Sequence, residues 1–120
     1  MDLQVMVNEI IGTFLFVSVI LMVKGEHTAG DRKGVCAAMC VTATLLTCIT
    51  GTTRLGACFN PAVGISLSAF SVMKYSTFYE NTHFMTHYTY AYTLGPALGG
   101  LLAGLFHLVH KKAFEPDERD

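Results

Sequence analysis

The stretch Gly56-Ala57-Cys58-Phe59-Asn60-Pro61-Ala62-Val63 places a helix start inside an almost uncharged region of the chain. Asn60 is a good N-cap, because its side-chain oxygen can accept a hydrogen bond from an amide two or three residues further on. Pro61 then occupies the first helical position, where its missing N–H costs nothing and its fixed φ suits a helix. The pattern therefore predicts a new helix here instead of the continuation of a longer one.

The predicted helix, over about residues 60–70, is too short to cross a bilayer. Ten residues at 1.5 Å per residue make about 15 Å, half of a hydrocarbon core about 30 Å thick. A helix that starts at mid-membrane and runs back to the surface its chain came from is a re-entrant half-helix. Non-helical backbone at that depth is tolerated only where it is buried in protein or lines a water-filled cavity.

The composition indicates an integral membrane protein. Of the 120 residues, 52% are hydrophobic and 14% are charged, whereas soluble domains carry about 25% charged residues. Residues 34–53 and 55–73 contain no charge at all. The net charge of −1 and the absence of a long basic run exclude nucleic acid as an expected partner.

We expect one membrane domain over residues 1–120, of the all-α integral membrane class. Its transmembrane helices are predicted at about 5–23, 34–51 and 88–109, with a polar tail over 111–120. The second helix is rich in Ala, Thr and Cys, which suit close packing, so we expect it in the interior. No signal or transit peptide precedes the first helix, and Met1 together with the polar tail leads us to expect a complete product.

Several residues within the apolar segments are candidates for a structural or functional role. Glu9 is either an interfacial acid at a helix N-terminus or an acceptor for backbone amides of the re-entrant loop. Gly95 and Gly99, and likewise Gly100 and Gly104, lie four residues apart and predict two stripes for close helix packing. The four cysteines are expected to be buried packing residues without disulfides: Cys36, Cys40, Cys48 and Cys58.

Three motifs resemble the aquaporin, or major intrinsic protein, family. Asn60-Pro61-Ala62 after Gly56-Ala57 is similar to the family signature, and Glu9-Ile10-Ile11-Gly12-Thr13-Phe14 to its first-helix motif. Gly95-Pro96-x-x-Gly99 is similar to the motif of its last helix. The resemblance implies three transmembrane helices plus one re-entrant half-helix, which is one of the two inverted repeats of that fold. A second Asn-Pro-Ala is absent from these 120 residues.

The distribution of lysine and arginine gives an orientation. The connection after the first helix and the C-terminal tail lie on one side, and the other side holds at most Arg54 and Lys74. By the positive-inside rule the N-terminus is outside and the C-terminus lies on the cytosolic or matrix side. In the family this is the orientation of the second repeat, which follows Asn-Pro-Ala with a filter arginine where this chain has Val63. The five residues of the basic side are Lys24, Arg32, Lys33, Lys111 and Lys112.

Two functions follow from the resemblance. Asn60 either donates to passing water, with Pro61 stacking on a partner's proline, or only caps its helix. Because one half-helix makes no pore, we expect mainly a structural or accessory subunit of a larger membrane assembly. The alternative is the pore-forming half of a channel for water or a small neutral solute, beside an inverted partner. The charge bias disfavours an inverted copy of this chain, so a hetero-oligomer is expected over a homodimer.

A metal or redox protein is a third, unrelated possibility. Pairs at helical spacing could ligate a metal, namely Cys36 with Cys40, His83 with His87, and His107 with His110. Such two-residue pairs are weak signals, and neither HExxH nor CxxC is present. We therefore expect no metal and no cofactor. Because no nucleophile–base pair or phosphate loop is evident, we expect no enzyme.

Overall fold

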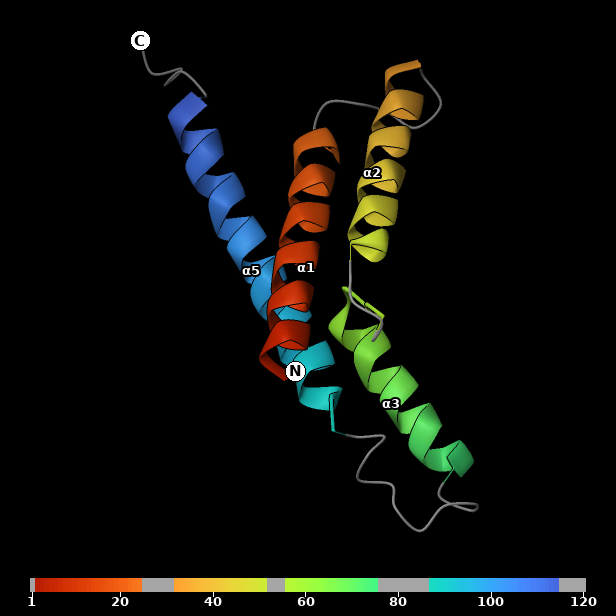
Figure 1. The fold of residues 1–120 in the computed structure, drawn as a ribbon. Helices are drawn as coiled ribbons and strands as arrows, with labels where there is room; N and C mark the ends of the chain where they lie inside the picture. The colour runs from red at the N-terminus through yellow and green to blue at the C-terminus, as the bar shows by residue number, and fades with distance from the viewer. Residues whose placement is uncertain (1, 25–31, 52–55, 76–86, 115–120) are drawn as a thin grey trace.

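The computed structural model describes residues 2–24, 32–51, 56–75 and 87–114. Their regular structure is entirely helical, as predicted (Figure 1). Four helices are described in these ranges: α1 (Asp2–Lys24), α2 (Arg32–Thr50), α3 (Pro61–Tyr75) and α5 (Thr89–Phe114).

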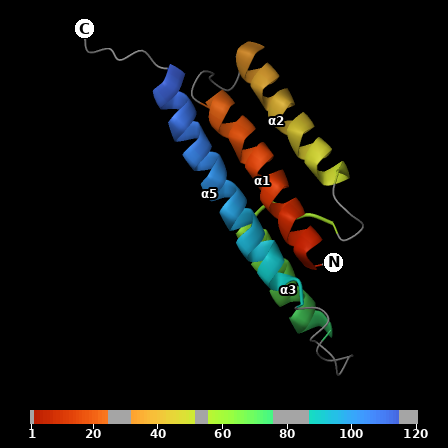
Figure 2. The same ribbon diagram turned by 60° about the vertical axis from the view of Figure 1, so that its left-hand side comes forward.

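The helices α1 and α5 form the centre of the molecule. They pack against each other more extensively than any other pair, and α2 lies on the opposite side of α1 from α5 (Figures 1 and 2). Most large apolar side chains remain exposed, such as Leu101 at 60% and Leu108 at 63%. An apolar exterior of this kind suits a chain whose surroundings are lipid, because helix association in lipid depends on close packing and not on hiding apolar surface from water.

Two helices are long and apolar enough to cross a membrane. They are Leu3–Lys24, with a mean hydropathy of 2.1, and Thr89–Ala113, with a mean hydropathy of 1.4. At 1.5 Å per residue they extend for about 33 and 38 Å, against a hydrocarbon core of about 30 Å. Gly34–Thr50 is a shorter apolar helix.

Small residues bring α1 and α5 together. A Cβ added to Gly95 would lie 2.7 Å from the Glu9 Cβ, and one added to Gly99 would lie 2.8 Å from the Thr13 Cβ. The two helices therefore approach too closely for larger residues at these positions. Gly100 and Gly104 behave differently, because a Cβ there would meet no atom within 4 Å. The first predicted glycine stripe faces α1, and the second faces open space.

The helix α2 is the outer helix of this chain, not an interior one. Among the described helices, α1 is the one that packs against α2 extensively. Cys36 and Cys40 on α2 are exposed instead of buried. Its threonine hydroxyls nevertheless have partners, because each donates to a carbonyl four residues earlier at 2.8–2.9 Å. This back-bonding explains how a helix rich in hydroxyls can lie at the edge of a membrane protein. The threonines concerned are Thr42, Thr44, Thr47 and Thr50.

Two helices end later than the sequence predicts. α3 continues to Tyr75 instead of about residue 70, and α5 continues through 111–114, which were assigned to the polar tail. Neither segment contains a Gly or Pro that would end the helix there. α3 begins near the end of α2 and leads away from it, toward the end of the molecule where α1 and α5 begin (Figure 1).

Candidate functional site at the start of α3

The start of α3 is capped locally. The Oδ1 atom of Asn60 accepts a hydrogen bond from the amide of Ala62 at 2.9 Å. The carbonyl of Asn60 accepts from the amide of Gly64 at 3.0 Å, which is the first hydrogen bond of the helix. Pro61 is the first helical residue and has no N–H to satisfy. The side chain of Asn60 is itself exposed, so the capped tip faces outward from the chain.

Glu9 supports the backbone that leads into this tip. Its side chain is 1% exposed, and its two carboxylate oxygens accept hydrogen bonds from consecutive amides. Oε1 accepts from the amide of Cys58 and Oε2 from the amide of Phe59, both at 2.9 Å. A buried amide without a partner costs about 1–3 kcal/mol, so the carboxylate removes a large penalty from non-helical backbone. Of its two predicted roles, the geometry corresponds to the acceptor of loop amides.

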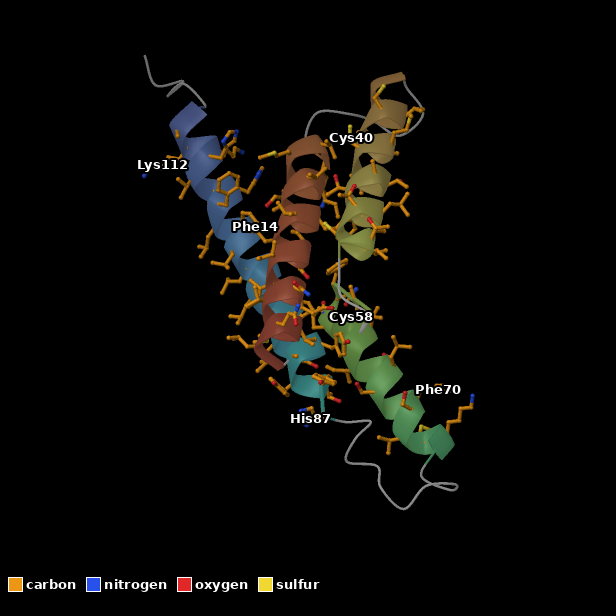
Figure 3. The ribbon with its side chains drawn as sticks, viewed as in Figure 1. Phe14, Cys40, Cys58, Phe70, His87 and Lys112 are labelled. Atoms are coloured by element: carbon orange, nitrogen blue, oxygen red, sulfur yellow. The ribbon has the colours of Figure 1, made fainter. Side chains whose placement is uncertain are left out.

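The thiol of Cys58 completes the surroundings of Glu9. Its Sγ lies 3.5 Å from Oε2 of Glu9, 3.5 Å from the carbonyl oxygen of Asn60 and 3.3 Å from that of Tyr92. One thiol proton can be donated to one of these acceptors at a time. Cys58 thus links α1, the tip and α5, in the position that Figure 3 labels at the start of α3.

Phe59 adopts a backbone conformation that the sequence did not predict. Its φ is +50°, in the left-handed region that bulky residues rarely occupy. The side chain is only 6% exposed, and its ring packs directly on Gly12 of α1. A Cβ at Gly12 would overlap the ring, so the glycine makes room for it. The signal for Gly12 was available, because it lies three residues after Glu9 and hence on the same face of α1.

The first turns of α3 lie against α5 through another glycine. Gly64 is buried, and a Cβ there would overlap the carbonyl oxygen of Tyr92. Beyond this contact an open pocket of about 360 Å³ lies between α3, the segment that precedes it and α5. Its walls include the hydroxyl-bearing residues Ser68, Ser71 and Thr89. The contact between Gly64 and Tyr92 was not predicted from the sequence, because nothing local indicates which residues of α5 face α3.

The remaining predicted residues are less involved. Val63, which directly follows Asn60-Pro61-Ala62, is 40% exposed on α3. Groups of three or more His, Cys, Asp or Glu that could hold a metal ion are absent from the described residues. Of the histidine pairs, His83 lies outside the described residues, whereas His107 and His110 lie on α5.

A comparison with known families identifies the class of protein. The profile of the family described as major intrinsic protein matches residues 1–107, so the chain belongs to that family. The chain is therefore an aquaporin-like integral membrane protein. Its family consists of channels and not of enzymes, which fits the expectation from the sequence. The comparisons with curated proteins and with solved structures gave no match.

Proposed function

We propose that this chain acts mainly as a structural or accessory subunit of a larger membrane protein assembly. The observation that carries the proposal is the exposed tip of α3, where Asn60 and Ala62 are uncovered and Val63 is 40% exposed. Polar, non-helical backbone at membrane depth cannot face lipid, which supports a second subunit that covers the tip or encloses a water-filled cavity beside it. Val63 in place of the filter arginine supports an accessory role over a conducting one.

The membrane arrangement that goes with this role has three transmembrane helices, α1, α2 and α5, and α3 as a re-entrant half-helix. The basic helix ends support an orientation with the C-terminus on the cytosolic or matrix side. Lys24, Lys112 and the beginning of α2 all lie at one end of the molecule (Figures 1 and 3). The same bias supports a different chain as partner over an inverted copy of this one.

A photo-crosslinking amino acid at position 63 tests the accessory role in native membranes. We expect a defined adduct with another membrane subunit, because the side chain at this position stands on the uncovered side of α3. The control is the same amino acid at Leu3, near the start of α1, where the side chain is 76% exposed. Adducts with lipid alone at position 63 would contradict the proposal.

The alternative function is the pore-forming half of a channel for water or a small neutral solute. The specific observation in its favour is that the Asn60 side chain, exposed at the start of α3, is held in place by the hydrogen bond that it accepts from the amide of Ala62. Asn60→Asp tests it, because Asp is an equally good N-cap but removes the amide donor and adds a negative charge. A conducting tip would change the swelling rate of vesicles that carry the native assembly. An accessory subunit leaves that rate unchanged.

A further inference from the structure

An apolar groove runs between α1 and α5, away from the tip of α3. It has a volume of about 500 Å³, and α1 contributes Ile10, Ile11 and Phe14 to its wall. On α5 it is lined by Leu102, Leu105, Phe106 and Val109. We call it the α1/α5 groove.

Aromatic rings form part of the wall of this groove. Phe14 and Phe106 meet edge to face across the two helices, with ring centroids 5.8 Å apart. Phe106 also stacks on His110, one turn further along α5, at 6.1 Å. By contrast, Leu105 is 52% exposed and Val109 is 69% exposed, so the described chain leaves the outer side of the groove open.

The groove leads to the basic end of the molecule. Lys112 follows Val109 by three residues, in the last turns of α5 (Figure 3). From Leu102 to Lys112 the helix rises by about 15 Å, which is half of the hydrocarbon core and hence one leaflet. An apolar path of one leaflet that ends beside a cation matches the length and the charge of one lipid molecule.

We propose that the α1/α5 groove binds one acyl chain of an anionic phospholipid, whose phosphate lies beside Lys112. The apolar wall suits the acyl chain, and the ammonium group complements the phosphate. A transmembrane helix of another subunit is the other conceivable occupant. The quenching experiment below distinguishes such a helix from a lipid. This site is independent of the accessory role proposed above.

The absence of tryptophan from the sequence allows a direct test. Leu105→Trp places the sole tryptophan of the full chain in the groove, and Leu101→Trp places it on α5 outside the groove, where the leucine is 60% exposed. Both variants are reconstituted in phosphatidylcholine vesicles. Each is titrated with brominated phosphatidylglycerol and, separately, with brominated phosphatidylcholine over the same range of fractions. We expect Leu105→Trp to reach half-quenching at an about fivefold lower fraction of the anionic lipid, the ratio that corresponds to about 1 kcal/mol per lysine.

Three results together support the site. Leu105→Trp prefers the anionic lipid, the added substitution Lys112→Gln abolishes the preference, and Leu101→Trp shows none. Equal quenching of Leu105→Trp by both lipids would overturn the proposal, because the groove would then hold ordinary surrounding lipid. An unquenched Leu105→Trp beside a quenched Leu101→Trp would also overturn it, because a protein would occupy the groove. Val109→Trp serves in place of Leu105→Trp if the latter does not fold.

Discussion

At the residue scale, the carboxylate of Glu9 decides whether the backbone before α3 can exist away from water. Consecutive amides of Cys58 and Phe59 point at its two oxygens, each at 2.9 Å. A carboxylate within a membrane is itself expensive unless it is paired. Here the carboxylate accepts from the two amides, so the cost of burying the charge and the cost of burying the amides are both reduced.

Glu9→Gln tests this mutual dependence. Glutamine offers one acceptor oxygen, and its NH₂ group would face an amide that also donates. We expect a loss of about 1–3 kcal/mol in the free energy of unfolding, measured by denaturant titration in detergent micelles. Leu3→Gln, which adds the same side chain at a position that is 76% exposed, is the control and should have little effect. Equal stabilities of the two variants would show that Glu9 does not support the loop.

Gly12 and Phe59 are expected to depend on each other in a similar way. Gly12→Ala forces a methyl group against the Phe59 ring, which should cost about 1–3 kcal/mol through overpacking. Phe59→Leu in the same chain should return part of that loss, and a double-mutant cycle measures the coupling. Gly100→Ala is the matched control, because its added methyl meets no atom within 4 Å. The account is wrong if Gly12→Ala and Gly100→Ala have the same stability.

At the scale of elements, the two glycine stripes of α5 have different surroundings. Gly99 lies against α1, whereas Gly104 has open space where a side chain would be. Gly99→Val should therefore separate α1 from α5 and lower the thermal unfolding temperature of the purified chain. Gly104→Val should leave that temperature unchanged. A similar loss in both variants would contradict the packing described for α5.

The sequence predicted the local features of these elements better than their contacts. The Asn60-Pro61 pattern names the residue at which α3 begins, because capping depends only on neighbours in the chain. The conformation of Phe59 could not be predicted, since its positive φ is stabilised by the distant Gly12 and Glu9. The interior position expected of α2 was wrong for this chain, because small residues indicate close packing but not which helix, or which subunit, provides it.

The pocket between α3 and α5 was beyond sequence reasoning for the same reason. Its walls combine Ser68 and Ser71 with Thr89, and the intervening residues give no indication of the register between the two helices. By contrast, the spacing of three between Glu9 and Gly12 is enough to place both on one face of α1, although the sequence analysis did not use it. Spacing within a helix is therefore informative, whereas contacts between helices need the structure.

At the scale of the whole molecule, the described helices leave the polar start of α3 without cover within this chain. Asn60 is exposed at the start of α3, whereas the backbone just before it is held by contacts with α1 and α5. Most large side chains on the exterior are apolar. Lipid suits the apolar exterior but not the tip. This contrast between a well-supported interior side and an uncovered outer side is the physical reason for proposing a partner subunit.

The mass of the particle that contains this chain tests the account most directly. The chain is extracted from its native membrane in mild detergent and examined by native mass spectrometry. The account predicts a hetero-assembly much heavier than the 13.1 kDa of the chain, in which another subunit covers the tip of α3. A stable particle that consists of one copy of the chain with lipid and detergent only would contradict it.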